Sequence, residues 1–413
     1  MTNEVKKVPQ LRFPNFGGEW EEKQLGDVTK TNQGLQIAIS DRKTKYEKGL
    51  YFYITNEFLR PNSQTKYYIE NPPESVVAEK SDILMTRTGN TGKVITNVEG
   101  AFHNNFFKIK YNKSIIDRLF LFELLKSPKI NNKFLSLAGT STIPDLNHSD
   151  FYSVYISFPT ISEQQKISTF FSKLDRQIEL EEQKLEKLKE QKKGYMQKIF
   201  SQELRFKDEN GNAYPEWKER KFSELLSYSS NGVDKKINKN HDIAYMVNYM
   251  DVFKKTKLNT KNRDLLMEIT ATKIQKEKNN LKKGDILFTP SSETREDIAK
   301  STVVFEDLDN TVYSYHLIRL RPLDSNIFSL KYSNYLSEQN FISKQFRRLA
   351  QGAQRYTVTK EHFENIKLNL PHIKEQEKIG AFFSKLDEVI NKQSQKIDEL
   401  KLRKQGFLQK MFV

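Results

Sequence analysis

The 413-residue chain contains no cysteine, which excludes disulfide bonds, thiolate metal sites and cysteine nucleophiles. It has only two tryptophans and six histidines, and the histidines are not spaced like metal ligands. The N-terminal residues MTNEVKKVPQ contain no apolar signal-peptide core, and no run of about 18 apolar residues occurs elsewhere. We therefore expect a cytoplasmic protein without a metal site or a membrane partner.

Acidic residues are outnumbered by basic ones, which gives a net charge of +15 and a pI of about 9.4. Two stretches, residues 161–200 and 373–413, carry only +2 and +3, so most of the excess lies in the segments of globular composition. A basic globular surface favours a polyanionic partner. The alternative is a lysine-rich composition without a binding role.

The chain is an internal repeat with a shift of 212 residues. The sequence FFSKLD occurs at Phe170–Asp175 and again at Phe382–Asp387, and 22 of the 42 residue pairs from Pro159–Phe200 and Pro371–Phe412 are identical. Each copy also has an Arg-Phe pair, one tryptophan and a D-I-L-x-T segment upstream of the shared tail. A period this long indicates a duplicated domain followed by a constant tail, not a solenoid.

Both tails have apolar residues at alternating steps of four and three, between residues rich in Glu, Lys and Gln. This spacing predicts a coiled coil whose helices begin just after Pro159 and Pro371. Four polar residues that interrupt the seam, Glu181, Lys192, Gln393 and Lys404, are expected to fix its register. The predicted seam consists of Ile167, Phe171, Leu174, Ile178, Leu185, Leu188, Ile379, Phe383, Leu386, Ile390, Ile397 and Leu400.

A helix of about 40 residues is roughly 60 Å long and has to bury its apolar stripe against a partner. The best available partner is the other copy, and a two-fold relation between the copies would make the helices antiparallel. Duplex DNA has the same symmetry, so this arrangement suits two globular parts that read two half-sites separated by a fixed spacer. Alternatively, each helix packs on its own domain.

The doubled tails, PTISEQQKISTFFSKLDRQI and PHIKEQEKIGAFFSKLDEVI, and their ends GYMQKIF and GFLQKMF make the chain resemble specificity subunits of type I restriction–modification systems. The segment GTSTIPDLNHSDFYSVYISFP (Gly139–Pro159) resembles the same family, whereas the second copy lacks its Pro-Asp-Leu element. The resemblance implies an α+β fold with two mixed α/β target-recognition domains and two long conserved helices forming an antiparallel coiled coil. The expected boundaries are 1–158 and 204–370 for the recognition domains, and 159–203 and 371–413 for the helices.

The resemblance also implies a function. Each recognition domain would read one half of a bipartite, asymmetric DNA target and direct adenine methylation and cleavage by partner subunits. The partners would be two modification subunits and the restriction subunits, which would carry S-adenosylmethionine, ATP and Mg²⁺. The chain itself would be non-catalytic and without a cofactor, in the cytoplasm of a bacterium.

Two short motifs come close to catalytic signatures without matching them. The segment NPPE at Asn71–Glu74 has Glu74 where adenine methyltransferases need an aromatic residue to stack on a flipped base. The segment GNTGKV at Gly89–Val94 lacks the first glycine and the final Ser or Thr of a phosphate-binding loop. Neither motif supports catalysis by this chain.

Base edges and phosphates are contacted mostly by Arg, Lys, Asn, Gln, Ser and Thr, often on loops. The best candidates follow the two D-I-L-x-T segments, because these loops share a scaffold and differ in sequence. The candidate DNA-binding residues of the first copy are Gln33, Arg42, Lys43, Lys45, Arg87, Thr88, Asn90, Lys93, Ser141 and Thr142. Those of the second copy are Lys235, Lys236, Lys239, Ser291, Ser292, Thr294, Arg295, Gln354, Arg355 and Tyr356.

Two other functional classes stay open at this point. The first is a non-enzymatic coiled-coil adaptor that carries two protein-binding domains. The second is a stand-alone enzyme, which would methylate or cleave DNA without partners. The sequence does not specify the DNA target, because base readout depends on side-chain geometry.

Overall fold

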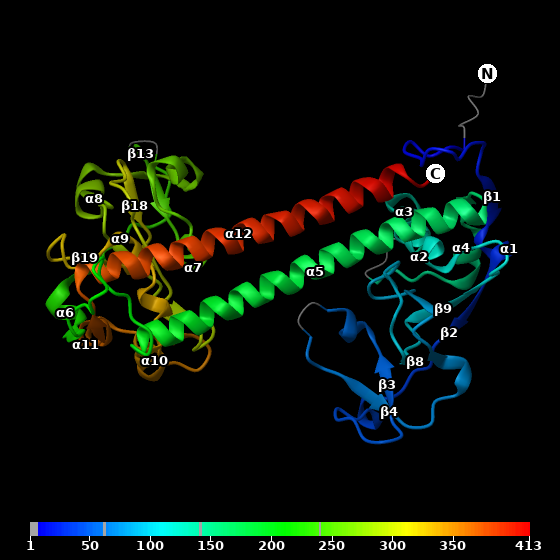
Figure 1. Ribbon diagram of the computed structural model, residues 1–413, viewed down its shortest axis with the longest axis horizontal. Coiled ribbons are helices and arrows are strands. Elements are labelled where there is room, and N and C mark those ends of the chain that lie inside the picture. Colours follow the sequence, from blue (N-terminus) through cyan, green and yellow to red (C-terminus); the bar gives the residue numbers. More distant parts are fainter. Residues whose placement is uncertain (1–6, 61–62, 140–142, 239–240) are drawn as a thin grey trace. The chain divides into compact units, whose positions relative to one another are not determined.

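Figure 1 shows the computed structural model, which describes residues 7–60, 63–139, 143–238 and 241–413. The chain divides into two units. Unit 1 comprises the residues up to Gln183 together with Gln395–Val413, and unit 2 comprises Lys184–Ser394. The two long helices, α5 (Ile161–Phe200) and α12 (Ile373–Lys410), each contribute to both units. The predicted α+β class, with duplicated mixed domains and two long helices, is confirmed.

The described residues of unit 1 form three small sheets. An antiparallel sheet has the order β2 (Thr29–Gln33), β9 (Phe106–Tyr111), β6 (Ile83–Thr86) and β7 (Val94–Ile95). A second sheet has the order β4 (Tyr67–Ile69), β3 (Tyr51–Ile54), β8 (Gly100–Phe102) and β5 (Val77–Ala78), with β3 and β8 parallel. The third pairs β1 (Glu21–Gln24) with β10 (Tyr155–Phe158). The helices are α1 (Leu25–Val28), α2 (Arg118–Lys126), α3 (Pro128–Leu137), α4 (His148–Ser153) and the 3₁₀ turns η1 (Ile39–Asp41), η2 (Asn56–Leu59) and η3 (Glu74–Val76).

In the part of the chain that the structure describes, unit 2 repeats the main sheet and the pairing of its first and last strands, whereas its second sheet has three strands and it has an additional two-stranded sheet. Its antiparallel sheet has the order β12 (Leu226–Ser229), β19 (Ile318–Pro322), β15 (Ile286–Phe288) and β17 (Ser301–Val303), and a second sheet has the order β14 (Met267–Ala271), β13 (Asp242–Val247) and β18 (Thr311–Tyr313). Strand β11 (Lys218–Lys221) pairs with β21 (Lys367–Leu370), and β16 (Ser291–Ser292) with β20 (Tyr356–Thr357). The helices are α6 (Phe222–Leu225), α7 (Tyr249–Phe253), α8 (Lys273–Lys278), α9 (Leu330–Ser333), α10 (Asn340–Leu349), α11 (Lys360–Asn365) and the 3₁₀ turns η4 (Thr260–Leu265) and η5 (Leu336–Glu338).

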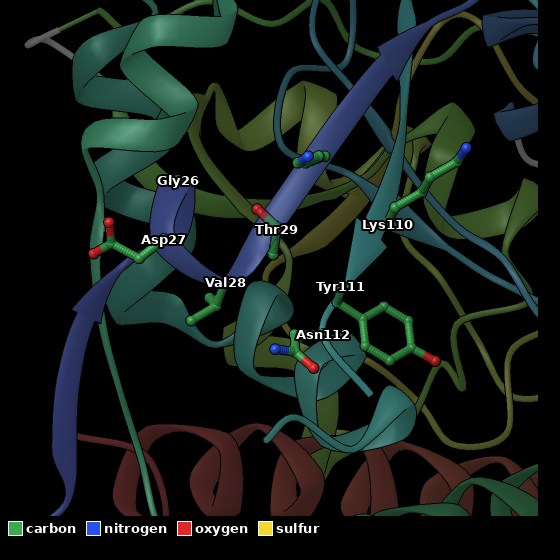
Figure 2. A pocket seen from close by; sticks show the side chains of 8 residues that line it. Gly26, Asp27, Val28, Thr29, Lys110, Tyr111 and Asn112 are labelled. Carbon is green, nitrogen blue, oxygen red and sulfur yellow. The ribbon is translucent and has the colours of Figure 1, made fainter. Parts of the chain in front are cut away.

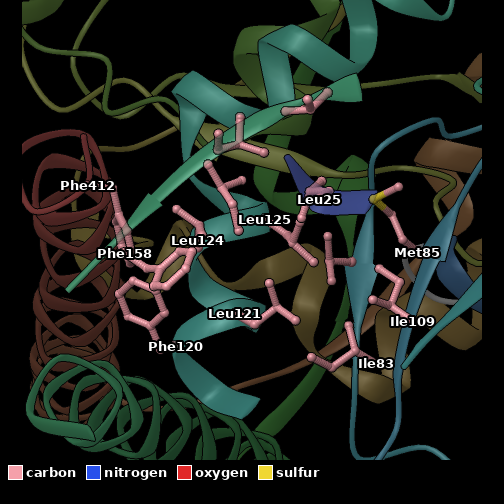
Figure 3. Close-up of a cluster of buried hydrophobic side chains, with 14 of the residues drawn as sticks. Leu25, Ile83, Met85, Ile109, Phe120, Leu121, Leu124, Leu125, Phe158 and Phe412 are labelled. Atoms are coloured by element: carbon pink, nitrogen blue, oxygen red, sulfur yellow. The ribbon is translucent and has the colours of Figure 1, made fainter. Parts of the chain in front are cut away.

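The core of unit 1 forms where α2 packs between the sheet and the long helices. Phe120, Leu121, Leu124 and Leu125 recur at helical spacing and are all fully buried, so that they form one apolar face. Figure 3 shows this face against the sheet residues Ile83, Met85 and Ile109, and next to Phe412 after α12. The corresponding core of unit 2 likewise includes residues of both long helices, among them Phe200 and Phe383.

The first turn of each long helix is fixed to its own unit by the same side chains. The carboxylate of Glu163 is 1% exposed and accepts two hydrogen bonds from Arg12 at 2.8 and 2.7 Å. Glu375 is fully buried and accepts hydrogen bonds from Arg205 at 3.2 and 2.7 Å and from the Trp217 indole at 2.9 Å. These contacts explain why the Arg-Phe pairs and the Glu-Gln dipeptides occur in both copies.

The glutamine that follows each of these glutamates adds three more hydrogen bonds. In unit 1 the Gln164 amide bonds the backbone of Ile115, Asp117 and Pro159 at 2.8–2.9 Å. In unit 2 the Gln376 amide bonds the backbone at positions 327, 329 and 371, which are the same positions shifted by 212. The start of each long helix therefore has a fixed geometry relative to its own domain.

Within unit 1 the two long helices run antiparallel. Phe170 packs edge-on against Phe407 and Phe171 stacks on Phe412. Lys404 forms an ion pair with Asp175 at 2.6 Å. From Phe170 to Asp175 on α5 the partner on α12 changes from Phe407 back to Lys404, which defines the direction of the pair.

Unit 2 contains the same contacts with the roles of the helices exchanged. Tyr195 packs edge-on against Phe382, Phe200 stacks on Phe383, and Lys192 forms an ion pair with Asp387 at 2.8 Å. In each of these pairs, one residue lies 212 positions after its unit 1 counterpart and the other lies 212 positions before it. The predicted seam residues Ile167, Phe171, Leu174, Ile178, Ile379, Phe383 and Ile397 are buried, whereas Leu185, Leu188, Leu386, Ile390 and Leu400 are half-buried.

The polar seam lysines also reach their domains, and there the two units differ. In unit 1 Lys404 contacts Glu123 of α2 at 3.3 Å, and this carboxylate is only 4% exposed. In unit 2 the position corresponding to Glu123 is Tyr335, and the acid is supplied one turn later by Glu338, 3.0 Å from Lys192. A second lysine, Lys255, forms an ion pair with the same Glu338. The ion pair between the two helices is thus the same in both units, whereas the acidic residue that connects it to the domain differs.

Candidate nucleic-acid interface

In unit 1 the predicted loop after β6 contacts Pro144 and Asp145, which lie more than 50 residues further along the chain. Strand β6 ends at Thr86, and the following loop is closed by hydrogen bonds between Thr86 and Lys93 at 2.9 Å. Arg87 then forms an ion pair with Asp145 at 2.7 Å, and Thr91 donates to the Pro144 carbonyl at 2.7 Å. The loop after β6 and the segment before α4 consequently form one surface.

The Arg87 side chain is largely buried and already has partners within the protein, so it is less available to a DNA base than an exposed arginine. The side chain is 17% exposed and its guanidinium lies 5.7 Å from the centre of the Phe107 ring. By contrast, Asn90 and Lys93 are exposed, and the Lys93 ammonium donates to the Leu59 carbonyl at 3.0 Å. Thr88 is half-buried. In this geometry Arg87 positions the loop, while Asn90 and Lys93 are the side chains open to a ligand.

Unit 2 joins the equivalent segments by different chemistry. The two-residue strands β16 and β20 pair Ser291 with Thr357 and Ser292 with Tyr356. The Arg355 guanidinium donates two hydrogen bonds to the Ser291 hydroxyl at 3.1 and 3.0 Å. Arg295 lies over the Tyr356 ring at 4.9 Å. Thr294, Arg295, Gln354 and Arg355 are exposed, Ser291 and Tyr356 are half-buried, and Ser292 is buried.

The remaining candidate DNA-binding residues lie in the segments next to Gly34 in unit 1 and Gly232 in unit 2. A Cβ atom on Gly34 would lie 2.1 Å from the Phe102 carbonyl oxygen, and one on Gly232 would lie 2.4 Å from Ser314 backbone atoms. Only glycine allows so close an approach of the two backbones. Next to Gly34, the Gln33 amide donates to the Asn104 carbonyl at 3.1 Å, so it is partly occupied.

Beyond these glycines the basic candidates divide into paired and exposed side chains. Arg42 lies over the Tyr53 and Tyr67 rings at 5.2 and 5.4 Å and donates to a backbone carbonyl, which indicates a structural role. Lys43 forms an ion pair with Glu70 at 2.6 Å, and its pKa is raised by that hydrogen bond. Lys45 and Lys235 are exposed, and Lys236 forms an ion pair with a neighbouring aspartate at 3.1 Å. Ser141, Thr142 and Lys239 lie outside the described residues.

A hollow of about 310 Å³ lies at the end of the β2–β9 pair in unit 1 (Figure 2). Three of its polar side chains are used in local structure. Asp27 accepts a hydrogen bond from the Gln24 backbone, Thr29 donates to the Leu25 carbonyl, and Asn112 accepts from Ser114. None of the predicted DNA-binding residues lines this hollow, and its side chains do not form an acid–base or nucleophile–base pair.

Sequence inspection missed three residues that shape these surfaces. Asp145 fixes Arg87, the Asn56 amide donates to the Thr88 carbonyl at 3.0 Å, and the Tyr249 hydroxyl donates to the Ser291 carbonyl at 2.9 Å. Asp145 belongs to the quoted Pro-Asp-Leu element, so a signal was present. Asn56 and Tyr249 are distant in sequence and carry no motif. Within the described ranges no group of His, Asp and Glu could hold a metal ion.

The family model for the type I restriction modification DNA specificity domain matches this chain twice, at residues 17–190 and 214–402. The chain belongs to this family. It is therefore a type I restriction–modification specificity subunit with two DNA specificity domains, as the resemblance indicated. The family match does not favour the alternative of a coiled-coil adaptor with protein-binding domains.

Similar proteins agree with this assignment. The chain is 24% identical over 412 residues to the "Type I restriction enzyme MjaVIII specificity subunit" of Methanocaldococcus jannaschii, which covers 96% of this chain and 92% of the relative. The crystal structure of a type I restriction–modification S subunit from M. genitalium has a TM-score of 0.58 at 16% identity and covers 98% of this chain and 99% of that one.

A further solved structure, reported with the assembly and conformational transition of the type I R-M system, has a TM-score of 0.57 at 16% identity and covers 94% and 96% of the two chains. At such identities the structural likeness establishes the shared fold. Separately, none of the helices in the described parts of the specificity subunit is long and apolar enough to span a membrane.

Proposed function

We propose that each unit of this specificity subunit reads one half of a bipartite, asymmetric DNA target. The observation that carries the proposal is the convergence, at the same place in both units, of the loop after β6 or β15 with the segment around residue 145 or 356. The scaffold strands correspond, and the exposed side chains do not. Units that share a scaffold and differ in donors would read two different half-sites.

The two long helices would set the distance between the half-sites. Their antiparallel contacts within each unit, and the fixed first turn of each helix, support a stiff connection between each reading surface and the helix pair. If the pair continues as one strut, the spacer between half-sites has one preferred length. We also propose that the long helices hold partner subunits; a solved structure of the same fold is reported with complex assembly of the type I R-M system.

The specificity subunit would itself be non-catalytic and would direct two modification subunits and the restriction subunits. These partners would supply S-adenosylmethionine for adenine methylation, and ATP and Mg²⁺ for translocation and cleavage, in the bacterial cytoplasm. The engagement of the polar groups in the Figure 2 hollow supports this division of labour. A purified chain that methylated or cleaved DNA without partners would contradict it.

The decisive experiment maps methylated adenines in the host genome with and without this chain. We expect one bipartite motif that disappears on deletion. Replacing residues 87–93 by the corresponding loop of a relative with a different target should change one half of the motif and leave the other half and the spacer unchanged. A matched replacement in the loop 289–297 should change the other half only. A motif that survives deletion, or changes in both halves, would refute the proposal.

A further inference from the structure

Unit 2 contains a basic cavity that adjoins its predicted recognition loop. The cavity has a volume of about 300 Å³ and lies between α5, η5, α10 and the end of the loop that follows β15. Five cationic side chains and two acidic ones line it. The cationic residues are Lys189, Lys192, Lys193, Lys300 and Arg347, and the acidic residues are Glu296 and Glu338.

Two of the five cations have no acidic partner among the residues that the structure describes. Lys192, Lys189 and Lys300 form ion pairs at 2.8–3.3 Å. Lys193 is exposed and unpaired, and Arg347 donates one hydrogen bond to the Ser343 hydroxyl at 2.9 Å. The Nε atom of Arg347 is buried and has no hydrogen-bond acceptor in the described structure. A buried donor without an acceptor is costly, which suggests that a ligand supplies the acceptor.

The cavity is connected directly to the recognition surface. The Arg295 guanidinium, which lies over Tyr356, donates to the backbone carbonyl of Arg347 at 3.4 Å. The chain then continues from Arg295 through Glu296 and Ile298 into the cavity wall. A DNA strand held by this loop would therefore pass close to the two unpaired cations.

Unit 1 does not carry the same charges. The positions 212 residues from Lys193 and Arg347 are Gln405 and Leu135. The position that corresponds to Lys189 is Lys401, and it forms an ion pair with Glu182 at 2.6 Å. The excess of unpaired charge at these positions is thus specific to unit 2.

We propose that this cavity binds a backbone phosphate of the DNA spacer, next to the half-site that unit 2 reads. The proposal rests on the proposed function and adds a sequence-independent contact to it. Arg347 and Lys193 would donate to the phosphate oxygens, as arginine and lysine do at phosphate groups elsewhere. The contact would place the first phosphates of the spacer against α5 on the unit 2 side only.

The test uses the full-length chain assembled with the modification subunits of its host and a fluorescent duplex that carries the mapped target. The variant K193Q/R347L installs the two residues that unit 1 has at these positions. Because each phosphate that is no longer neutralised lowers the slope of log K against log salt by about 0.9, we expect a slope smaller by about one. Affinity near 0.15 M salt should fall about tenfold, with the methylated motif unchanged.

Four controls make the outcome specific. K401Q changes the ion-paired lysine of unit 1 that corresponds to Lys189, and it should leave the salt slope unchanged. R347K keeps the positive charge and should retain most of the wild-type salt slope. Neutral methylphosphonate linkages next to the unit 2 half-site should weaken the wild type but not K193Q/R347L, whereas linkages next to the other half-site should affect both equally. Thermal unfolding of K193Q/R347L close to that of the wild type would show that the fold is retained.

An unchanged salt slope in K193Q/R347L overturns the inference, and so does equal sensitivity of wild type and variant to every methylphosphonate. Competition by millimolar inorganic phosphate without any methylphosphonate effect would show a free-anion site instead, which also overturns it. If the proposed function itself were wrong, the wild-type assembly would bind the bipartite target no better than a scrambled duplex.

Discussion

Glu338 is expected to hold the junction between α5, α12 and the domain of unit 2 together. Its carboxylate accepts from Lys192 at 3.0 Å and from Lys255, and all three side chains are less than a third exposed. Substitution by glutamine keeps the shape and removes the charge, which leaves the Lys255 ammonium without an acidic partner, next to the Asn334 carbonyl at 2.9 Å. Truncating one partner of a fully buried pair costs about 3–5 kcal/mol, so for this partly exposed pair we expect about 2–3 kcal/mol.

This loss can be measured because each unit contains one tryptophan. Trp217 of unit 2 can be followed alone by fluorescence in a Trp20→Phe background. For a unit of about 200 residues, 1 kcal/mol corresponds to about 2–4 °C, so Glu338→Gln should lower the midpoint of the Trp217 transition by about 5–10 °C. The double variant Glu338→Gln/Lys255→Met should be more stable than Glu338→Gln alone, because it no longer leaves an unpaired ammonium.

The same variant makes a prediction about pH. Burial alone would raise the pKa of Glu338, but the ammonium groups of Lys255 and Lys192 outweigh it and hold the pKa below its usual value. A carboxyl with a depressed pKa stabilises the fold above its unfolded pKa, about 4.3, and loses this contribution as the pH falls through the folded pKa. The difference in the free energy of unfolding between wild type and Glu338→Gln should therefore have its full size at pH 7 and become smaller below about pH 4. A difference that is absent at pH 7, or constant down to pH 3, would refute this account.

Three further outcomes follow from the other contacts. Arg87→Ala should reduce methylation at the mapped target about tenfold and relax one half-site only, because it frees the loop from Asp145; an unchanged methylation pattern would contradict this. Gln376→Ala removes three hydrogen bonds to backbone groups and should destabilise unit 2 by about 2–3 kcal/mol, measured by denaturant unfolding followed by Trp217. Inserting four residues between positions 183 and 184, with four matching residues between 394 and 395, adds about 6 Å to the helix pair. It should lengthen the preferred spacer by about two base pairs, and a constant spacer in methylome sequencing would exclude the strut.

The repeat and the long helices could be predicted from the sequence because their signals are local. The identical FFSKLD segments and the four–three spacing fix the helices without any knowledge of the domains. The structural roles of the Arg-Phe pairs and of the Glu-Gln dipeptides were not predicted, although both motifs occur in each copy of the repeat. Their role depends on an arginine meeting a glutamate about 150 or 170 residues away.

The candidate DNA-binding residues show where sequence reasoning stops. Arg42 and Arg87 have the chemistry of base readers, yet their guanidinium groups lie over aromatic rings and bond carbonyl or carboxylate oxygens. Nothing in the local sequence distinguishes them from the exposed Arg295 and Arg355. The acid at Glu338 was equally hidden, because the corresponding position of the first copy is Lys126. These assignments depend on non-local packing, which one sequence does not encode in a readable pattern.

The exchanged ion pairs, Asp175 with Lys404 and Lys192 with Asp387, have an evolutionary consequence. Both partners of each pair come from the constant tails, so a recombination event that replaces a whole variable part leaves them intact. Strains that share such tails could then combine any first part with any second part, and the number of specificities would grow as a product. An incoming part has to supply the arginine that pairs with the buried glutamate of the tail. It also has to supply a carboxylate to the tail lysine, as Glu123 does in one native part and Glu338 in the other.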